Sequence, residues 1–145
     1  MPPGASAPRK QAALPQGGSP VYAFLERPSL IDYPGRLCGV FFISGCNFSC
    51  GFCHNAPLMG KKQKGIPWSR LDEVCRRFKT EWVDAVCITG GEPTLAADLI
   101  RLIEFFRGCG FKIKLDSNGA RPEVLKDCLP LIDYIAMDIK AGLSG

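Results

Sequence analysis

The chain has 145 residues, of which 46% are hydrophobic, and its formal net charge is +4. This length and apolar content predict one domain with a core of its own. Charges of both signs are interspersed, so the small basic excess does not indicate nucleic-acid binding. No run approaches the ~20 apolar residues of a membrane-spanning helix, so we expect no membrane insertion.

Residues 1–20 are rich in Pro and Gly and poor in large apolar side chains, which predicts a disordered tail before a domain over residues 21–145. The tail has no apolar region of the kind found in secretory signals. We therefore expect the eight cysteines to lie in a reducing cytoplasm, where clustered cysteines more often bind metals or catalyse than form disulfides.

Strand-like and helix-like segments alternate along the remaining chain. Residues 21–25 form a short strand-like run, and longer strands are predicted at residues 37–44, 83–89, 111–116 and 134–139. A first helix is predicted after Ser69, and two more cover residues 96–107 and 122–129. This alternation predicts an α/β fold with a parallel sheet and right-handed crossovers.

The first predicted helix has a starting signal and an apolar stripe. Ser69 is the expected N-cap, and Asp72 and Glu73 would lie in the first turn, near the positive end of the helix dipole. The residues expected on its packing face are Leu71, Val74, Cys75, Phe78 and Trp82.

A group of three cysteines follows the strand predicted at residues 37–44. Cys46, Cys50 and Cys53 are spaced C-x3-C-x2-C, and three thiolates could hold three irons of a cubane cluster and leave the fourth iron open for substrate. A Cys3His zinc site with His54 and disulfide bonds are the alternatives. His54 follows Cys53 directly, and adjacent residues rarely both reach one tetrahedral metal without strain. The other five cysteines are expected to act as small buried hydrophobes.

The next predicted strand ends in a glycine pair followed by an acidic residue. Gly90 and Gly91 would let the backbone come close to a small polar ligand, and the Glu92 carboxylate could hold an ammonium group. The alternative is an ordinary strand-to-helix turn.

Polar side chains also end the last two predicted strands. Asp116, Ser117 and Asp138 offer hard oxygens that could hold a cation, and Lys140, on the same side of its strand as Asp138, could pair with a ligand carboxylate. The alternative is a set of surface caps and ion pairs. In parallel α/β sheets, open or closed into a barrel, ligands bind at the carboxyl ends of the strands, where all these motifs are predicted to lie.

The order of the four motifs, CNFSCGFC, GGEPT, DSNG and DIK, resembles that of the radical S-adenosylmethionine (SAM) superfamily. The opening SLIDYPGRL at residues 29–37 and CHN at residues 53–55 are similar to glycyl-radical-enzyme activating proteins, above all those of anaerobic ribonucleoside-triphosphate reductase and pyruvate formate-lyase. The resemblance covers residues 21–145. It implies a partial (β/α) barrel with about four of the family's six strand–helix units, the N-terminal part of a radical SAM core.

The resemblance also implies a set of site residues. Cys46, Cys50 and Cys53 would bind three irons of a [4Fe–4S] cluster, and SAM would chelate the fourth through its amino and carboxylate groups. The remaining assignments are Phe52 near the adenine, Gly90, Gly91 and Glu92 at the methionine amino group, Asp116, Ser117 and Asp138 as residues that order the site, and Lys140 at the methionine carboxylate. A monovalent cation could be bound beside the ordering residues.

The activity that the resemblance implies is reductive cleavage of SAM to a 5′-deoxyadenosyl radical, which takes a hydrogen atom from a glycine of a partner glycyl-radical enzyme. Reduced flavodoxin or ferredoxin would be the electron donor. Two alternatives stay open: a radical SAM enzyme acting on a small molecule, similar to carboxy-deazaguanine synthases, and a metal-binding module without catalysis.

Overall fold

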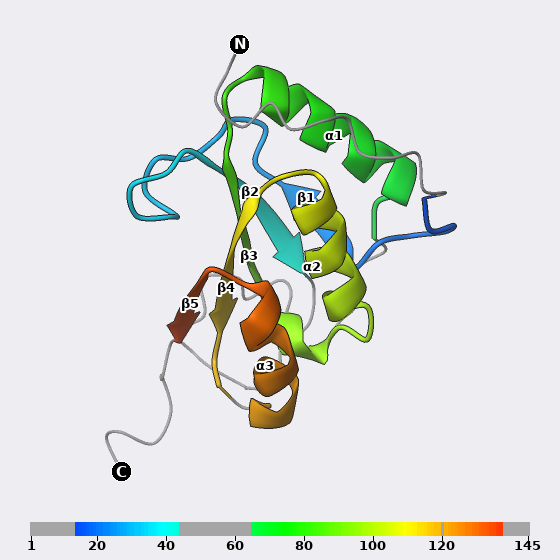
Figure 1. Cartoon of the computed structure of the whole chain (residues 1–145). Helices are drawn as coiled ribbons and strands as arrows, with labels where there is room; N and C mark the ends of the chain where they lie inside the picture. Colours follow the sequence, from blue (N-terminus) through cyan, green and yellow to red (C-terminus); the bar gives the residue numbers. More distant parts are fainter. Residues whose placement is uncertain (1–13, 44–64, 120, 138–145) are drawn as a thin grey trace.

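The computed structural model describes residues 14–43, 65–119 and 121–137. These residues form one five-stranded sheet with the strand order β1-β2-β3-β4-β5 (Figure 1). The strands are β1 (Val21–Phe24), β2 (Cys38–Ile43), β3 (Ala85–Gly90), β4 (Lys112–Ser117) and β5 (Tyr134–Met137). The first pair is antiparallel, and the pairs from β2 to β5 are parallel. The predicted α/β fold with a parallel sheet is thereby confirmed.

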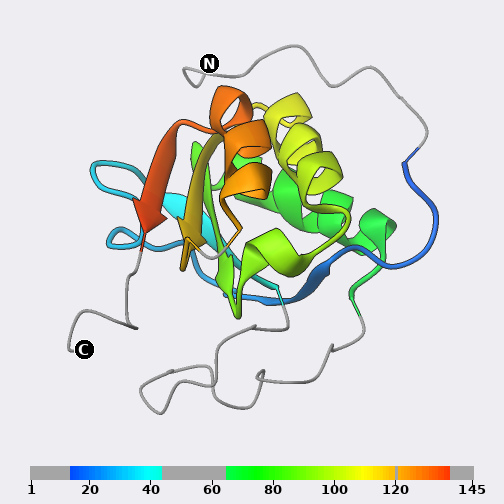
Figure 2. The ribbon, with the colours of Figure 1, turned by 90° about the horizontal axis from the view of Figure 1, so that it is seen from below.

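The helices all lie on one side of the sheet, as the view from below shows (Figure 2). They are α1 (Trp68–Thr80), α2 (Leu99–Gly108) and α3 (Pro122–Cys128), with short 3-10 turns η2 (Pro93–Leu95) and η3 (Leu129–Leu131). Each lies between two parallel strands in the chain, as crossover connections require. This one-sided cover agrees with part of a β/α barrel, whose helices lie outside the strands.

Aromatic rings fill the layer between the sheet and the helices. Phe41 of β2 lies 4.7 Å from Phe106 of α2 and 6.0 Å from Phe78 of α1, measured between ring centroids. All three side chains are fully buried. A Cβ atom at Gly39 would come within 2.6 Å of the Phe78 ring, so the absence of a side chain there lets α1 approach β2.

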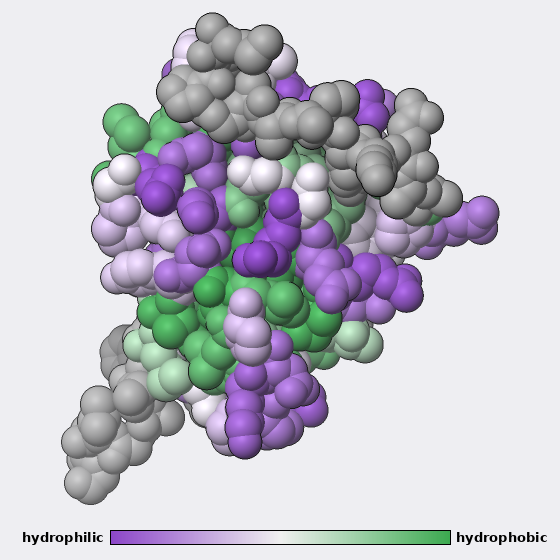
Figure 3. Space-filling view, viewed as in Figure 1, coloured by the Kyte–Doolittle hydropathy of each residue, from purple (hydrophilic) through white to green (hydrophobic). Residues whose placement is uncertain are grey.

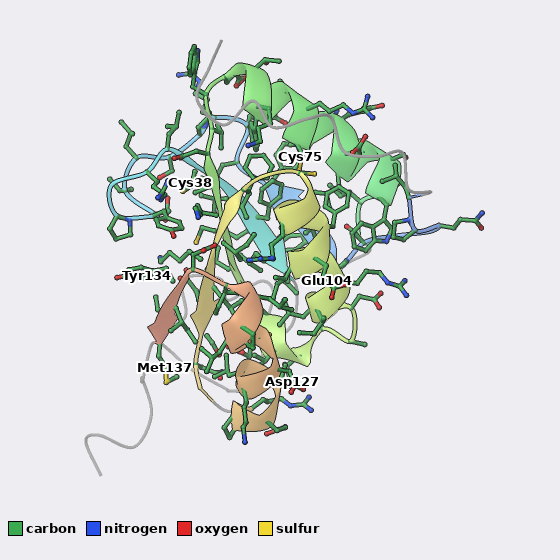
Figure 4. All side chains as sticks on the ribbon, in the orientation of Figure 1. Cys38, Cys75, Glu104, Asp127, Tyr134 and Met137 are labelled. Atoms are coloured by element: carbon green, nitrogen blue, oxygen red, sulfur yellow. The ribbon has the colours of Figure 1, made fainter. Side chains whose placement is uncertain are left out.

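The other face of the sheet carries a second, smaller apolar cluster, which contains Cys38, Val40, Ala85, Cys87 and Tyr33. Figure 4 shows Cys38 and Tyr134 on the opposite side of the sheet from Glu104 of α2. The segment before β2 folds over this face, since the Tyr33 ring lies 5.7 Å from the ring of Tyr134 in β5. The helix-free face is therefore partly covered by the chain's own N-terminal loop.

The start and end of the first helix differ from the prediction. Helix α1 begins at Trp68, with Pro67 at the N-cap position and no side-chain cap, and its first turn contains no acidic residue. Ser69 is therefore inside the helix, because burial of the Trp68 ring (1% exposed) fixes an earlier start. Trp82 does not join the packing stripe: the helix ends at Thr80, the backbone of Trp82 has φ 66°, and its side chain is 63% exposed.

Ordered contacts begin before the predicted domain start at residue 21. The Ser19 backbone N–H donates to the Ile66 carbonyl at 2.8 Å, Gly18 forms an isolated bridge with Pro67, and Ser19 is buried. The division into tail and domain otherwise stays a prediction.

The exposed surface and the cysteines agree with a packed domain. In Figure 3, apolar residues gather in the middle of one face and hydrophilic residues surround them. Cys38, Cys75, Cys87 and Cys128 are buried, as expected for small hydrophobes, and Cys109 is half-buried. Within the described ranges, no helix is long and apolar enough to cross a membrane.

Candidate functional site

The carboxyl ends of β2, β3 and β4 are tied together by hydrogen bonds at one edge of the sheet. The backbone N–H of Gly91, just after β3, donates to the Ile43 carbonyl at the end of β2 at 2.8 Å. On the other side, the Asn118 backbone N–H after β4 donates to Glu92 Oε1 at 2.7 Å. Figure 2 looks towards this edge of the sheet.

The structure brings together five of the predicted site residues at this edge: Gly90, Gly91, Glu92, Asp116 and Ser117. The other six lie outside the described residues: Cys46, Cys50, Phe52, Cys53, Asp138 and Lys140. Among the described residues, no group of three or more His, Cys, Asp or Glu side chains is arranged to hold a metal ion. The predicted metal ligands therefore belong to the part of the chain that is not described.

Glu92 is buried at the centre of a hydrogen-bond network. Its side chain is fully buried, and its two oxygens accept from four donors. Oε2 accepts from the Thr94 backbone N–H at 3.1 Å, from the Thr94 hydroxyl and from the Ser117 hydroxyl at 2.8 Å. Oε1 accepts from the Asn118 backbone N–H. Glu92 thus links the β3 loop to the end of β4, and both of its oxygens already have partners within the chain.

Ser117 completes this link. Its hydroxyl donates to Glu92 and also accepts from the Gly119 backbone N–H at 3.1 Å, and the residue is 4% exposed. We infer from these contacts that Ser117 and Glu92 shape the loops that border the site.

Gly90 has a structural role that the sequence analysis did not predict. Its φ is +119°, a conformation that side-chain-bearing residues rarely adopt. A Cβ atom there would lie 2.3 Å from the Ile43 carbonyl oxygen and 2.5 Å from the Ile43 nitrogen. The close approach at Gly90 is therefore to the neighbouring strand, and it allows β2 and β3 to end side by side.

Asp116 lies in β4 on the helix-free face, within a small polar cluster. Lys114, two residues earlier on the same face, places Nζ 3.0 Å from Asp116 Oδ1. The Cys87 thiol of β3 donates to Asp116 Oδ2 at 3.5 Å. Oδ1 is buried and accepts no hydrogen bond of good geometry, so its contact with Lys114 is an ion pair and not a directed bond.

The charges in this cluster follow from burial and proximity. Burial, and then the nearby Asp116, raise the pKa of the Cys87 thiol far above its usual range, so this thiol stays protonated. Burial also raises the pKa of Cys38 to about 11. For Lys114, burial is the largest single effect and lowers the pKa, but the hydrogen bond and charge of Asp116, together with Cys87 and Asp32, raise the pKa overall. Lys114 is therefore a persistent cation beside Asp116.

The described edge suits the polar end of an amino acid only in part. The side chain of Asp116 is 32% exposed and is next to the glycine-containing end of β3, which provides a charged group and backbone groups in one place. Glu92 and Ser117, in contrast, are closed off by their own hydrogen bonds. Direct contact from this edge would thus come mainly from the backbone at Gly90 and Gly91, because both oxygens of Asp116 are already contacted by Lys114 and Cys87.

Sequence reasoning missed the partners that organise this edge, namely Thr94, Lys114, Cys87 and Asn118. For Lys114 a signal was present, since Lys-x-Asp in a strand places both charges on one face. For Thr94 the signal was its position two residues after Glu92, where a hydroxyl and a backbone N–H can reach one carboxylate. Cys87 and Asn118 depend on strand neighbours and had no local signal.

The fold and the site define an α/β domain whose polar loops gather at the carboxyl ends of parallel strands, the edge at which such domains bind ligands. The sequence pattern of the Radical SAM superfamily matches residues 40–144. The chain belongs to this superfamily, and membership implies a [4Fe–4S] cluster and SAM as its cofactors.

Three relatives show how the chain compares with known proteins. Two proteins of Methanocaldococcus jannaschii, both provisionally named glycyl-radical enzyme activating enzymes, are 38% identical over 115 residues and 37% identical over 98 residues. These alignments cover 77% and 67% of this chain, and 47% and 37% of the relatives. A 7-carboxy-7-deazaguanine synthase of Thermococcus kodakarensis is 29% identical over 117 residues, which cover 67% of this chain and 46% of that protein. The chain thus spans about half or less of each relative.

Proposed function

We propose that this chain carries the cofactor-binding part of a glycyl-radical enzyme activating enzyme. In the proposed reaction, the [4Fe–4S] cluster would supply one electron, received from a reduced flavodoxin or ferredoxin, for the reductive cleavage of the sulfonium carbon–sulfur bond of SAM to methionine and a 5′-deoxyadenosyl radical. That radical takes one hydrogen atom from a glycine of the partner enzyme, so the products are 5′-deoxyadenosine and a glycyl radical.

In this proposal, the residues of the chain bind and orient the two cofactors. Cys46, Cys50 and Cys53 hold three irons as thiolates, and the fourth iron is left for the amino and carboxylate groups of SAM. Phe52 packs near the adenine, and Lys140 pairs with the methionine carboxylate.

The described edge of the sheet contributes the remaining proposed contacts. The segment Gly90–Glu92 contacts the methionine amino group, with its backbone nearest to the ligand because the Glu92 oxygens are bonded within the chain. Asp116, Ser117 and Asp138 order the site at the ends of β4 and β5.

One observation carries most of the proposal: the C-x3-C-x2-C motif follows β2, and the last residue of β2, Ile43, accepts a hydrogen bond from the backbone N–H of Gly91, just after β3. The start of the cysteine segment is therefore close in sequence to the edge that holds the β3 and β4 loops. The names of the two Methanocaldococcus relatives support the activating function.

The test is anaerobic reconstitution of the protein with iron and sulfide, followed by reduction in the presence of SAM. We expect about four irons per chain and release of 5′-deoxyadenosine, and we expect a glycyl radical by electron paramagnetic resonance when the partner enzyme is added. Cleavage of SAM without a radical on any glycyl-radical enzyme would leave the superfamily chemistry intact and reject the activating role. One zinc per chain in a colourless protein would instead indicate a metal-binding module.

A second candidate function is radical chemistry on a small molecule. The similarity to the Thermococcus 7-carboxy-7-deazaguanine synthase favours it, because that relative aligns with a share of this chain similar to that of the second Methanocaldococcus protein. If this candidate is right, 5′-deoxyadenosine release will be stimulated by a small substrate and not by a glycyl-radical protein.

A further inference from the structure

Lys114 and Asp116 form a charge pair within a single strand, on the face without helices. Their side chains are 13% and 32% exposed, and Nζ lies 3.0 Å from Oδ1. The second carboxylate oxygen, Oδ2, is taken by the Cys87 thiol at 3.5 Å. Both oxygens of Asp116 are thus contacted by groups of this chain.

The ammonium group is held in position from several sides. Lys114 Nζ lies 4.0 Å from the Cys87 sulfur and 5.9 Å from the centroid of the Tyr134 ring in β5. Tyr134 in turn packs against the buried Tyr33. A side chain fixed in this way loses little further entropy when it neutralises Asp116.

A bound cation beside Asp116 would compete with this ammonium group for the same oxygen. Asp138 lies outside the described residues, and both oxygens of Asp116 already have a neighbour in this chain: Lys114 at Oδ1 and Cys87 at Oδ2. A second positive charge next to Lys114 would also be repelled by it. The geometry of the described residues therefore does not suit the monovalent cation that the sequence suggested.

We propose that Lys114 is an internal counter-ion which takes the place of a bound monovalent cation at Asp116, so that this end of the site needs no added cation. Lys114 is a positioning residue in this proposal, because it acts on the site through the Asp116 carboxylate. The expectation that SAM binding needs no added cation rests on the proposed function. The expectation that the protein's thermal stability needs no added cation does not rest on it.

The experiment measures the thermal unfolding midpoint of the reconstituted full chain in KCl and in choline chloride at equal ionic strength, which keeps charge screening constant. For the wild-type protein we expect midpoints within about 1 °C of each other. Lys114→Met should lower the midpoint in choline by about 4 °C, and KCl should restore much of this loss with a saturable dependence on its concentration.

Two variants serve as controls. Lys112→Met removes a lysine from the same strand and the same face, but this side chain is 53% exposed and 3.9 Å from Asp133, so we expect no cation dependence. The double variant Lys114→Met/Asp116→Asn removes both charges and should respond to KCl no more than the Lys112 variant does. A parallel titration with SAM should give the same dissociation constant for the wild type in both salts.

Saturable stabilisation of the wild-type protein by KCl would overturn the proposal, even if Lys114→Met does not fold. A Lys114→Met variant that folds and responds to KCl as the wild type does would also overturn it. If the proposed function is wrong, the result is different. SAM will then not bind in either salt, but the unfolding midpoints of the wild type and the variants will still follow the pattern expected for Lys114.

Discussion

Glu92→Gln is the substitution that most directly tests how the edge of the sheet is held together. The side-chain carboxylate of Glu92 accepts backbone N–H groups on both oxygens, from Thr94 on Oε2 and from Asn118 on Oε1. A glutamine has one acceptor oxygen and one NH2 group. In either orientation, one of the two backbone N–H groups would face another donor in a buried position.

The loss of folding stability in Glu92→Gln follows from these contacts. Losing a hydrogen bond to a charged group costs about 1.5–3 kcal/mol. Glutamine is neutral, so the variant no longer buries a charge, and this gain offsets part of the cost. We therefore expect Glu92→Gln to destabilise the fold by about 2 kcal/mol. For a chain of 145 residues this lowers the thermal midpoint by about 6 °C.

The assay is thermal unfolding followed by circular dichroism, with Glu104→Gln as the matched control. Glu104 is exposed on α2, so its substitution should change stability by no more than about 0.5 kcal/mol. A double-mutant cycle with Ser117→Ala should give a coupling energy of about 1 kcal/mol, because the Ser117 hydroxyl donates to Glu92. Equal midpoints for the Glu92 and Glu104 variants would refute the reasoning.

Two further predictions concern the β3 end and the buried thiols. Gly90→Ala should destabilise the protein by about 3 kcal/mol or more, because the new Cβ would meet the Ile43 backbone. The control Gly35→Ala, also at positive φ but with nothing within 4 Å, should cost about 1 kcal/mol in a urea titration, and equal costs would contradict the packing at Gly90. Burial raises the pKa of the Cys38 thiol from 9.0 to about 11. The neutral buried thiol therefore makes its full contribution to the free energy of unfolding below pH 9, and this contribution is lost as the pH rises through 11. In the native protein at pH 8, iodoacetamide should therefore leave Cys38 and Cys87 unmodified in mass spectrometry, and rapid alkylation would show that this face is open.

The sequence was sufficient for the strand–helix alternation and for the position of the polar motifs. Apolar runs such as residues 37–44 have few alternatives to a buried strand, and parallel strands place their carboxyl ends at one edge. For this reason the sequence pattern alone assigns Gly90, Glu92 and Asp116 to a common site.

Local signals failed where packing overrides them. Ser69 has a high N-cap propensity, but Pro67 in an extended conformation and the burial of Trp68 start the helix before it. Trp82 fits the helical period, yet the helix ends at Thr80 and the ring turns outward.

The role of Glu92 could not be predicted because it depends on which strand lies beside β3. The sequence shows a carboxylate next to two glycines, which is equally compatible with a ligand contact and with a structural bond. Only the placement of β4 next to β3 brings Asn118 and Ser117 to its oxygens.

The proposed function depends above all on a cluster held by Cys46, Cys50 and Cys53 with one iron open to SAM. Its most direct test is the electron paramagnetic resonance spectrum of the reduced, reconstituted protein before and after addition of SAM. We predict one [4Fe–4S] signal that changes when SAM is added, and loss of the cluster in Cys50→Ala. A cluster signal that SAM leaves unchanged would contradict the claim.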